Sequence, residues 1–241
     1  MKLWKSWVIA AKDFSVFRNK KSVIYSVVLL PFVVSISLPI AIGSGQGIPP
    51  ALLSELLNSF SFFFIILAAS LTTVIASYSL IGEKVEKSIE PLLATPTTDG
   101  EILLGKCFAA FLPTIVSIYV GLVIFMVLTD IMTYKTLGYF YFPNWDIAIM
   151  ILIITPLASI LSVELGVIIS SRVNDVRSAQ QLGQLVIIPF FGVYLLSQIG
   201  FISLHINNLL IISGILLAID LVLFYISTIT FNREEILTNW K

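Results

Sequence analysis

The sequence predicts an all-α membrane protein with six transmembrane helices in a single domain, residues 1–241. The first observation is composition: 58% of the 241 residues are hydrophobic and 12% are charged, whereas soluble domains have about 45–50% apolar and about 25% charged residues. A chain this apolar cannot bury its side chains in a core of its own size, so lipid must be its solvent. The second observation is a set of six apolar stretches long enough to cross a bilayer: about 22–42, 57–81, 102–129, 146–170, 181–201 and 208–231.

The third observation is the distribution of Lys and Arg between these stretches. Thirteen of the fourteen lie in the two terminal segments, or in or at the edge of the connections after the second and fourth stretches. Only Lys135 lies in a connection on the other side, after the third stretch. Lys and Arg of short loops stay in the cytoplasm, so we expect both termini to be cytoplasmic and the protein to lie in the plasma membrane. The net charge is zero, which does not favour a nucleic-acid partner. No cleavage pattern follows the first apolar run, which we expect to remain as an anchor.

Two segments outside the spans predict contact with the membrane surface. Residues 2–18 place apolar side chains at helical spacing with charged ones between them, which predicts an amphipathic helix lying in the inner lipid interface. Its apolar positions are Trp4, Trp7, Val8, Ala11 and Phe14, and its charged positions are Lys5, Lys12 and Asp13. In the outer connection 130–145, an aromatic group predicts anchoring among lipid headgroups. This group consists of Tyr134, Tyr139, Tyr141 and Trp145.

The connection between spans two and three, residues 82–100, is longer than a turn requires. One apolar stripe runs along an otherwise charged short helix, and Pro91 and Thr95-Pro96 end it. Thr98 and Glu101 form a T-x-x-E capping box that begins the third span. The mixed charge favours a docking surface for a soluble protein, with an interfacial helix lying on lipid as the alternative. The candidate docking residues are Glu83, Val85, Glu86, Ile89, Glu90, Leu92 and Leu93.

The polar segment 170–181 offers either a second contact for the same partner or a solvated turn. Its candidate residues are Arg172, Asp175 and Arg177. Two acids lie inside predicted spans, Glu164 in the fourth and Asp220 in the sixth, where ionisable groups are costly and face protein or water. For each of these two acids, both a structural role and a role in transport remain possible interpretations. Cys107 is expected to be a small apolar filler, because a single cysteine forms neither an intramolecular disulfide nor a cysteine metal cluster.

Several of these segments resemble one known family. GEK at 82–84, EPLLATP at 90–96 and EILLGK at 101–106 are similar to the permease subunits of type-2 ABC exporters. The AKD sequence at 11–13, Arg18, and SRVND at 171–175 are also similar. The resemblance covers essentially the whole chain and is most specific in its central block.

The resemblance implies six spans per subunit, a dimer with a second permease subunit of the same or another sequence, and a separate cytoplasmic ATPase. Carried over, Gly82 to Ala94 would be the coupling helix that engages this ATPase, and ATP and Mg would bind to the partner, with no cofactor on this chain. The chain contains no G-x-x-x-x-G-K-[ST] phosphate loop, which agrees with a separate ATPase subunit. One departure is the outer connection 202–207, which is shorter than the hairpins that family members often carry there.

Other functions have less support in the sequence. A membrane enzyme would need paired catalytic groups, but the chain has one His, His205, and neither H-E-x-x-H nor G-x-S-x-G. We therefore expect no catalysis by this chain. A stand-alone secondary transporter often shows internal repeats, and none is clear between residues 1–129 and 130–241. A membrane assembly factor with the same fold is a third alternative.

Overall fold

The computed structural model describes residues 3–19, 25–44, 49–85, 97–173 and 175–230, and these residues form helices joined by short connections. In chain order the elements are α1 (Leu3–Asn19), the π-helical turn η1 (Tyr25–Leu29), α3 (Leu30–Ser44), α4 (Pro50–Val85), α6 (Asp99–Leu137), α7 (Trp145–Ile149), the π-helical turn η2 (Met150–Ile154), α8 (Thr155–Arg172), α9 (Val176–Gly183), the 3₁₀ turn η3 (Gln184–Val186), α10 (Ile187–Gln198) and α11 (Ile206–Thr230).

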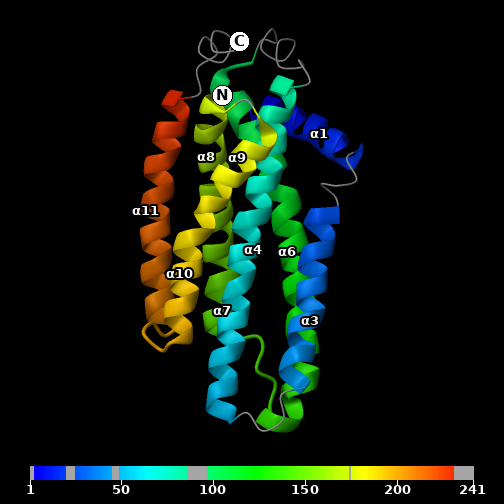
Figure 1. The fold of residues 1–241 in the computed structure, drawn as a ribbon, viewed down its shortest axis with the longest axis vertical. Helices are drawn as coiled ribbons and strands as arrows, with labels where there is room; N and C mark the ends of the chain where they lie inside the picture. The colour runs from blue at the N-terminus through cyan, green and yellow to red at the C-terminus, as the bar shows by residue number, and fades with distance from the viewer. Residues whose placement is uncertain (1–2, 20–24, 45–48, 86–96, 174, 231–241) are drawn as a thin grey trace.

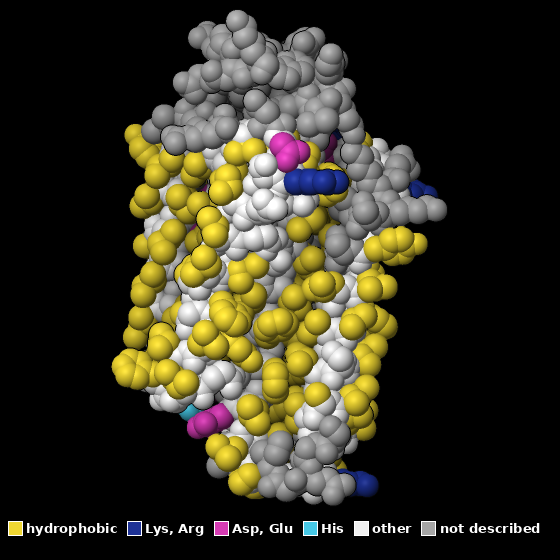
Figure 2. All heavy atoms as spheres, in the orientation of Figure 1, with side chains coloured by type: hydrophobic (Ala, Val, Ile, Leu, Met, Phe, Trp, Pro, Cys, Tyr) yellow, Lys and Arg dark blue, Asp and Glu magenta, His cyan; other side chains and the backbone are white. Residues whose placement is uncertain are grey.

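Five helical segments are long and apolar enough to cross a membrane. They are Leu52–Ser79, Gly100–Leu137, Trp145–Ser170, Val176–Gln198 and Ile206–Ser227, and a shorter apolar helix covers Val27–Gly43. The all-helical fold class and five of the predicted spans are therefore confirmed for the described residues. Space-filling side chains on one face are mostly hydrophobic along the bundle, with charged groups near its two ends (Figure 2), as expected for a surface in contact with lipid.

Helix α4 lies at the centre of the bundle. It packs against α6, α8, α9 and α10. Of its 18 most apolar consecutive residues 78% are buried, against 22% for the corresponding stretch of α11. Phe62, Phe64 and Ile65 of α4 are fully buried and contribute to the two largest apolar clusters. Because lipid is as apolar as these side chains, close packing rather than exclusion of water holds such helices together.

Two helices extend beyond the predicted spans on the side opposite α1. We expected connections at 43–56 and 130–145, but α4 begins at Pro50 and α6 continues to Leu137. Hydropathy marks the apolar core of a helix, and polar residues such as Glu55 and Asp130 can continue the same helix into the interface. Gly138 ends α6 in the left-handed conformation, φ 77°, and its N–H donates to the Tyr134 carbonyl oxygen, a geometry that favours glycine.

Helix α1 lies obliquely across one end of the bundle, where α4 ends and α6 begins (Figure 1); we call this the α1 end. The predicted apolar stripe is its outer face, with Trp4 75% and Trp7 48% exposed. A second face, absent from the sequence prediction, packs into the bundle. It consists of Ser6, Ile9, Ala10, Asp13 and Phe17, all buried.

Prolines in two helices are compensated by hydroxyl groups of α6. In η2 the Thr155 N–H donates to the Met150 carbonyl oxygen, five residues back. In the same pattern the Ile151 carbonyl oxygen would accept from the amide of residue 156, but Pro156 has no N–H. The Tyr119 hydroxyl donates to that carbonyl oxygen at 2.9 Å. On the other side of α6, Ser117 Oγ donates to the Val27 carbonyl oxygen at 2.5 Å, four residues before Pro31.

The fifth predicted span, 181–201, is an interrupted helix formed by α9, η3 and α10. At the interruption Gly183 lies against Thr73 of α4, where an added Cβ would come within 2.4 Å of Thr73 Cγ2. Gln184 is fixed to Ser70 by two hydrogen bonds: Ser70 Oγ donates to Gln184 Oε1 at 3.0 Å, and Gln184 Nε2 donates to the Ser70 carbonyl oxygen at 3.1 Å. A 3₁₀ stretch inside a helix often marks a hinge.

Candidate functional site

The predicted docking segment begins at the α1 end. Helix α4 extends through Glu83 and Val85, which are thus in its last turn. The described chain resumes at residue 97, and α6 begins at Asp99. The remaining predicted docking residues lie outside the described residues: Glu86, Ile89, Glu90, Leu92 and Leu93. The structure therefore defines the two stems of this segment, the end of α4 and the start of α6.

The start of α6 is a complete capping box, as the sequence predicted. The Glu101 N–H donates to Thr98 Oγ1 at 3.3 Å, and the Thr98 N–H donates to Glu101 Oε2 at 3.1 Å. The same Glu101 oxygen lies 3.9 Å from Lys5 Nζ of α1. The carboxylate is 4% exposed, so it satisfies the first turn of α6 and also holds α1 against it.

A buried ion pair joins α1, α4 and α6 just inside this cap. Lys106 Nζ of α6 lies 3.7 Å from Asp13 Oδ2 of α1, and it donates to the Ser79 carbonyl oxygen of α4 at 2.7 Å. Ser79 Oγ donates to Asp13 Oδ2 at 2.5 Å. The Lys106 and Asp13 side chains are 3% and 5% exposed. A buried charge is tolerated only when it is paired and hydrogen-bonded, so these three groups fix the three helices together.

Close packing supports the same junction. An added Cβ on Gly105 of α6 would lie 2.7 Å from the Ser6 carbonyl oxygen and 2.8 Å from Ile9 Cβ, both on α1. Only glycine permits this approach of two backbones. We call the junction of Lys5, Asp13, Ser79, Glu101 and Lys106 the α1 clamp, because it holds both stems of the 86–96 segment against one helix.

The second predicted contact lies where α8 passes into α9. Asp175 is the N-cap of α9, and its Oδ2 accepts from the Ser178 N–H and the Ser178 hydroxyl, each at 3.0 Å. These bonds, the backbone N–H first, lower the pKa of the Asp175 carboxyl. Arg177 is exposed in the first turn of α9, and Arg172 is the last residue of α8. Capping explains Asp175 without a partner protein, so the solvated-turn interpretation needs no further contact.

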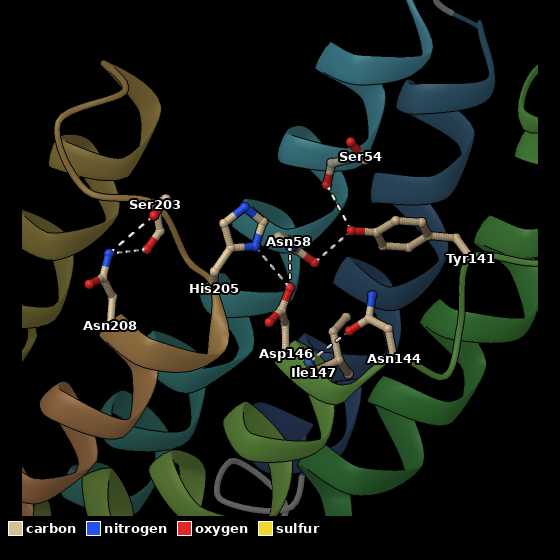
Figure 3. A network of polar contacts seen from close by, with 9 residues as sticks. All are labelled: Ser54, Asn58, Tyr141, Asn144, Asp146, Ile147, Ser203, His205 and Asn208. Atoms are coloured by element: carbon tan, nitrogen blue, oxygen red, sulfur yellow. Dashed lines mark hydrogen bonds and ion pairs between the residues drawn. The ribbon is translucent and has the colours of Figure 1, made fainter.

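The opposite end of the bundle carries a second polar network, which the sequence analysis missed (Figure 3). His205 Nδ1 lies 3.2 Å from Asp146 Oδ2, and the Asn58 side-chain amide donates to the same oxygen at 3.3 Å. The Tyr141 hydroxyl donates to Asn58 Oδ1 at 2.9 Å and to the Ser54 carbonyl oxygen at 3.1 Å. These contacts join α4, α7 and the connection before α11. No local pattern signals them, because the partners lie far apart in sequence.

This network changes the interpretation of the outer aromatic group. Trp145, Tyr139 and Tyr134 are exposed, as headgroup anchoring requires. Tyr141 is half-buried and hydrogen-bonded instead. Burial, followed by the nearby Asp146 carboxylate, raises the pKa of the Tyr141 phenol to about 12. Tyr141 is thus part of the helix junction and not of a lipid-facing belt.

Comparison with known proteins identifies the family. A family model described as ABC-2 family transporter protein matches residues 7–236. The chain belongs to this family. No curated protein matches it. The match includes both stems, the 86–96 segment and the clamp helices α4 and α6, so the resemblance noted in the sequence is confirmed over nearly the whole length. ABC-2 membership and the apolar helices together indicate a multi-pass membrane permease of an ABC transporter.

In this ABC-2 chain, one short sequence comes close to a phosphate-binding loop. Residues 100–107, GEILLGKC, fit G-x-x-x-x-G-K-[ST] except for Cys107 at the last position. The structure places them in the first turns of α6, where Gly105 packs on α1 and Lys106 pairs with Asp13. A phosphate loop must instead present free backbone N–H groups and its Lys to a nucleotide. Residues 100–107 therefore serve helix packing.

The remaining candidates of this ABC-2 chain lie inside the bundle. Glu164 of α8 and Asp220 of α11 are both buried, 4% and 5% exposed. Cys107 packs among Ile9, Ile102, Leu103 and Val167, which agrees with its expected role as an apolar filler. Among the described residues, no group of three or more His, Cys, Asp or Glu side chains could hold a metal ion.

Proposed function

We propose that this chain is the permease subunit of an ATP-binding-cassette exporter, that it crosses the plasma membrane six times with cytoplasmic termini, and that it forms the substrate pathway as a dimer. In this proposal α3 provides the first span and the α1 end faces the cytoplasm. A separate soluble ATPase binds ATP and Mg and docks on Gly82 to Ala94. The chain itself carries out no catalysis.

The observation that carries the proposal is the α1 clamp. A segment that only connected two spans would need no fixed base. Here α6 is joined to α1 through two ion pairs, and α4 is joined to α1 by the hydrogen bond from Ser79 to Asp13. A force applied at 86–96 would reach α4 and α6 together, because Ser79 and Lys106 are bonded to each other and to Asp13. Since α4 packs along α8, α9 and α10, its displacement would extend to most of the bundle.

The interrupted fifth helix supplies a place where such a displacement could change the pathway. Gln184 and Gly183 contact α4 at Ser70 and Thr73, directly at the 3₁₀ turn. We propose that movement of α4 alters the angle between α9 and α10 and so opens the path toward the outer side. Members of the ABC-2 family generally work with an ATPase partner, which supports docking on protein over a helix that lies on lipid.

The test is purification of the membrane complex from cells that produce the wild-type chain or the variant Glu90→Lys with Leu93→Asp. The matched control is Lys135→Glu with Tyr139→Asp, which makes similar changes at exposed positions of the opposite end. We expect a protein with a phosphate loop to copurify stoichiometrically, and its ATPase activity to be retained, with the wild type and the control but not with the docking variant.

Absence of any ATPase from the wild-type complex, with the protein folded, would contradict the proposal and favour a stand-alone transporter or an assembly factor. Equal recovery with the docking variant would place the ATPase contact elsewhere on the chain.

A further inference from the structure

Two acidic side chains lie buried between neighbouring helices away from both polar networks. Glu164 is on α8 and Asp220 is on α11, and these two helices pack along each other. Glu164 is followed by eight residues to the end of its helix at Arg172, and Asp220 by ten to the end of its helix at Thr230. Helices α8 and α11 both run toward the α1 end (Figure 1), so the two carboxyl groups lie at a similar depth in the bundle.

These carboxyl groups lack the partners that other acids of this chain have. Glu164 Oε2 and both oxygens of Asp220 are buried without a hydrogen bond. By contrast, Asp130 Oδ1 accepts from the N–H groups of Tyr141 and Phe142, and Asp13 pairs with Lys106. A buried polar group without a partner requires an explanation, and an ionised carboxylate in such a place is strongly unfavourable.

No Lys or Arg among the described side chains is an electrostatic neighbour of either acid. The electrostatic neighbour of Glu164 on α11 is Asp220, and on α6 it is the Cys107 thiol. Lys106 of α6 pairs with Asp13, and Asp146 of α7 pairs with His205. Other titratable side chains of the packed helices include Tyr78 of α4, Arg177 of α9 and Tyr225 of α11.

Glu164 and Asp220 lie on adjacent helices, near enough for the charge of one to act on the other. In a medium of low dielectric two such carboxyl groups oppose each other's ionisation. A metal ion would relieve this repulsion, but it needs further ligands, and the described residues offer no third His, Cys, Asp or Glu in such a group. A proton needs none. It neutralises one carboxyl and turns it into a hydrogen-bond donor.

We propose that Glu164 and Asp220 form an intramembrane proton-binding pair, which keeps at least one proton at neutral pH and holds α11 against α8. Release of the proton would place negative charge between the two helices and weaken their contact. This inference does not depend on the docking of an ATPase.

The experiment is infrared spectroscopy of the purified protein in lipid nanodiscs across about pH 5 to 9, which lies above the usual pKa of a carboxyl group in water. The C=O stretch of a protonated carboxylic acid is distinct from the carboxylate bands. We expect this band in the wild type at neutral pH and its loss in Asp220→Asn with Glu164→Gln. The control Asp130→Asn, which alters an acid with backbone partners, should retain it.

The wild-type titration alone is decisive if the variants fail to fold. A folded wild type without a protonated carboxyl band at neutral pH would overturn the proposal. A band that disappears on addition of Na⁺ or Ca²⁺ at constant pH would also overturn it, because the pair would then be a metal-ion site. A thermal midpoint that falls with rising pH in the wild type, and less in the double variant, is the supporting result, since a native state that binds more protons loses stability as they are removed.

Discussion

Replacement of Tyr119 by Phe removes one oxygen atom and tests how α6 compensates for Pro156. The Tyr119 hydroxyl donates to the Ile151 carbonyl oxygen at 2.9 Å, and Pro156 lacks the N–H that would otherwise serve this carbonyl. Phe has nearly the same shape, so the substitution creates no cavity and leaves the carbonyl without its donor. We expect a loss of about 1 kcal/mol, since side-chain hydrogen bonds between membrane helices contribute roughly 0.6 kcal/mol on average and about 1.7 kcal/mol at most.

The same structure predicts that the loss depends on the proline. In Pro156→Ala a backbone N–H becomes available at the position next to Thr155, whose own N–H already donates five residues back. Tyr119→Phe should therefore cost almost nothing in the Pro156→Ala background, and the double-mutant cycle should give a coupling of about 1 kcal/mol.

Cys107 provides the assay. It is the only thiol of the chain and it packs between α1, α6 and α8 through Ile9, Leu103 and Val167, so its labelling reports loss of this packing. Unfolding in mixed micelles, followed by the reaction of Cys107 with a fluorogenic dye, would give the free energy of unfolding for the four proteins of the cycle. An equal cost of Tyr119→Phe with and without Pro156 would refute the assignment of the hydroxyl to the missing N–H.

Three further predictions concern the ends of the bundle. Gly105→Leu should displace α1 and increase Cys107 labelling of the folded protein, because the added Cβ would lie 2.7 Å from the Ser6 carbonyl oxygen; unchanged labelling would contradict the close packing. Lys106→Met should lower the free energy of unfolding by about 3–5 kcal/mol, the usual cost of breaking a buried ion pair by removing one partner, whereas in an Asp13→Leu background the same change should cost much less. Tyr141 should resist ionisation in a spectrophotometric titration until about pH 12. Because its pKa is raised in the folded state, Tyr141 should contribute fully to stability below about pH 10, and this contribution should be lost as the pH rises toward about 12. The fall in stability should be smaller in Tyr141→Phe.

Local sequence patterns were sufficient for part of the fold and of the site. The capping box at Thr98 and Glu101 was predicted because both of its bonds join residues three apart. Five of the six expected spans were predicted because lipid imposes a length and a composition on each helix. The stripe of Trp4 and Trp7 marked the exposed face of α1 for the same reason.

The rest depends on partners that no local pattern brings together. Asp13 was taken as part of a polar face, but it is buried, because Lys106 and Ser79 lie on two other helices that meet at that point. His205 showed no partner pattern in sequence, yet it contacts Asp146 across the outer end of the bundle. The periodicity also predicted one apolar, lipid-facing stripe on α1, whereas its contact with the bundle uses a second face that the periodicity did not indicate.

The most direct test of the proposed coupling is photo-crosslinking from position 90. A photoreactive amino acid would replace Glu90 in the complex purified from cells, with the same residue at Lys135 as the matched control, since Lys135 is exposed at the opposite end. The proposal predicts that position 90 crosslinks to a soluble ATPase and that position 135 does not. Crosslinks from position 90 to lipid alone, in a complex that still contains the ATPase, would contradict it and indicate that the 82–94 segment lies on the membrane surface.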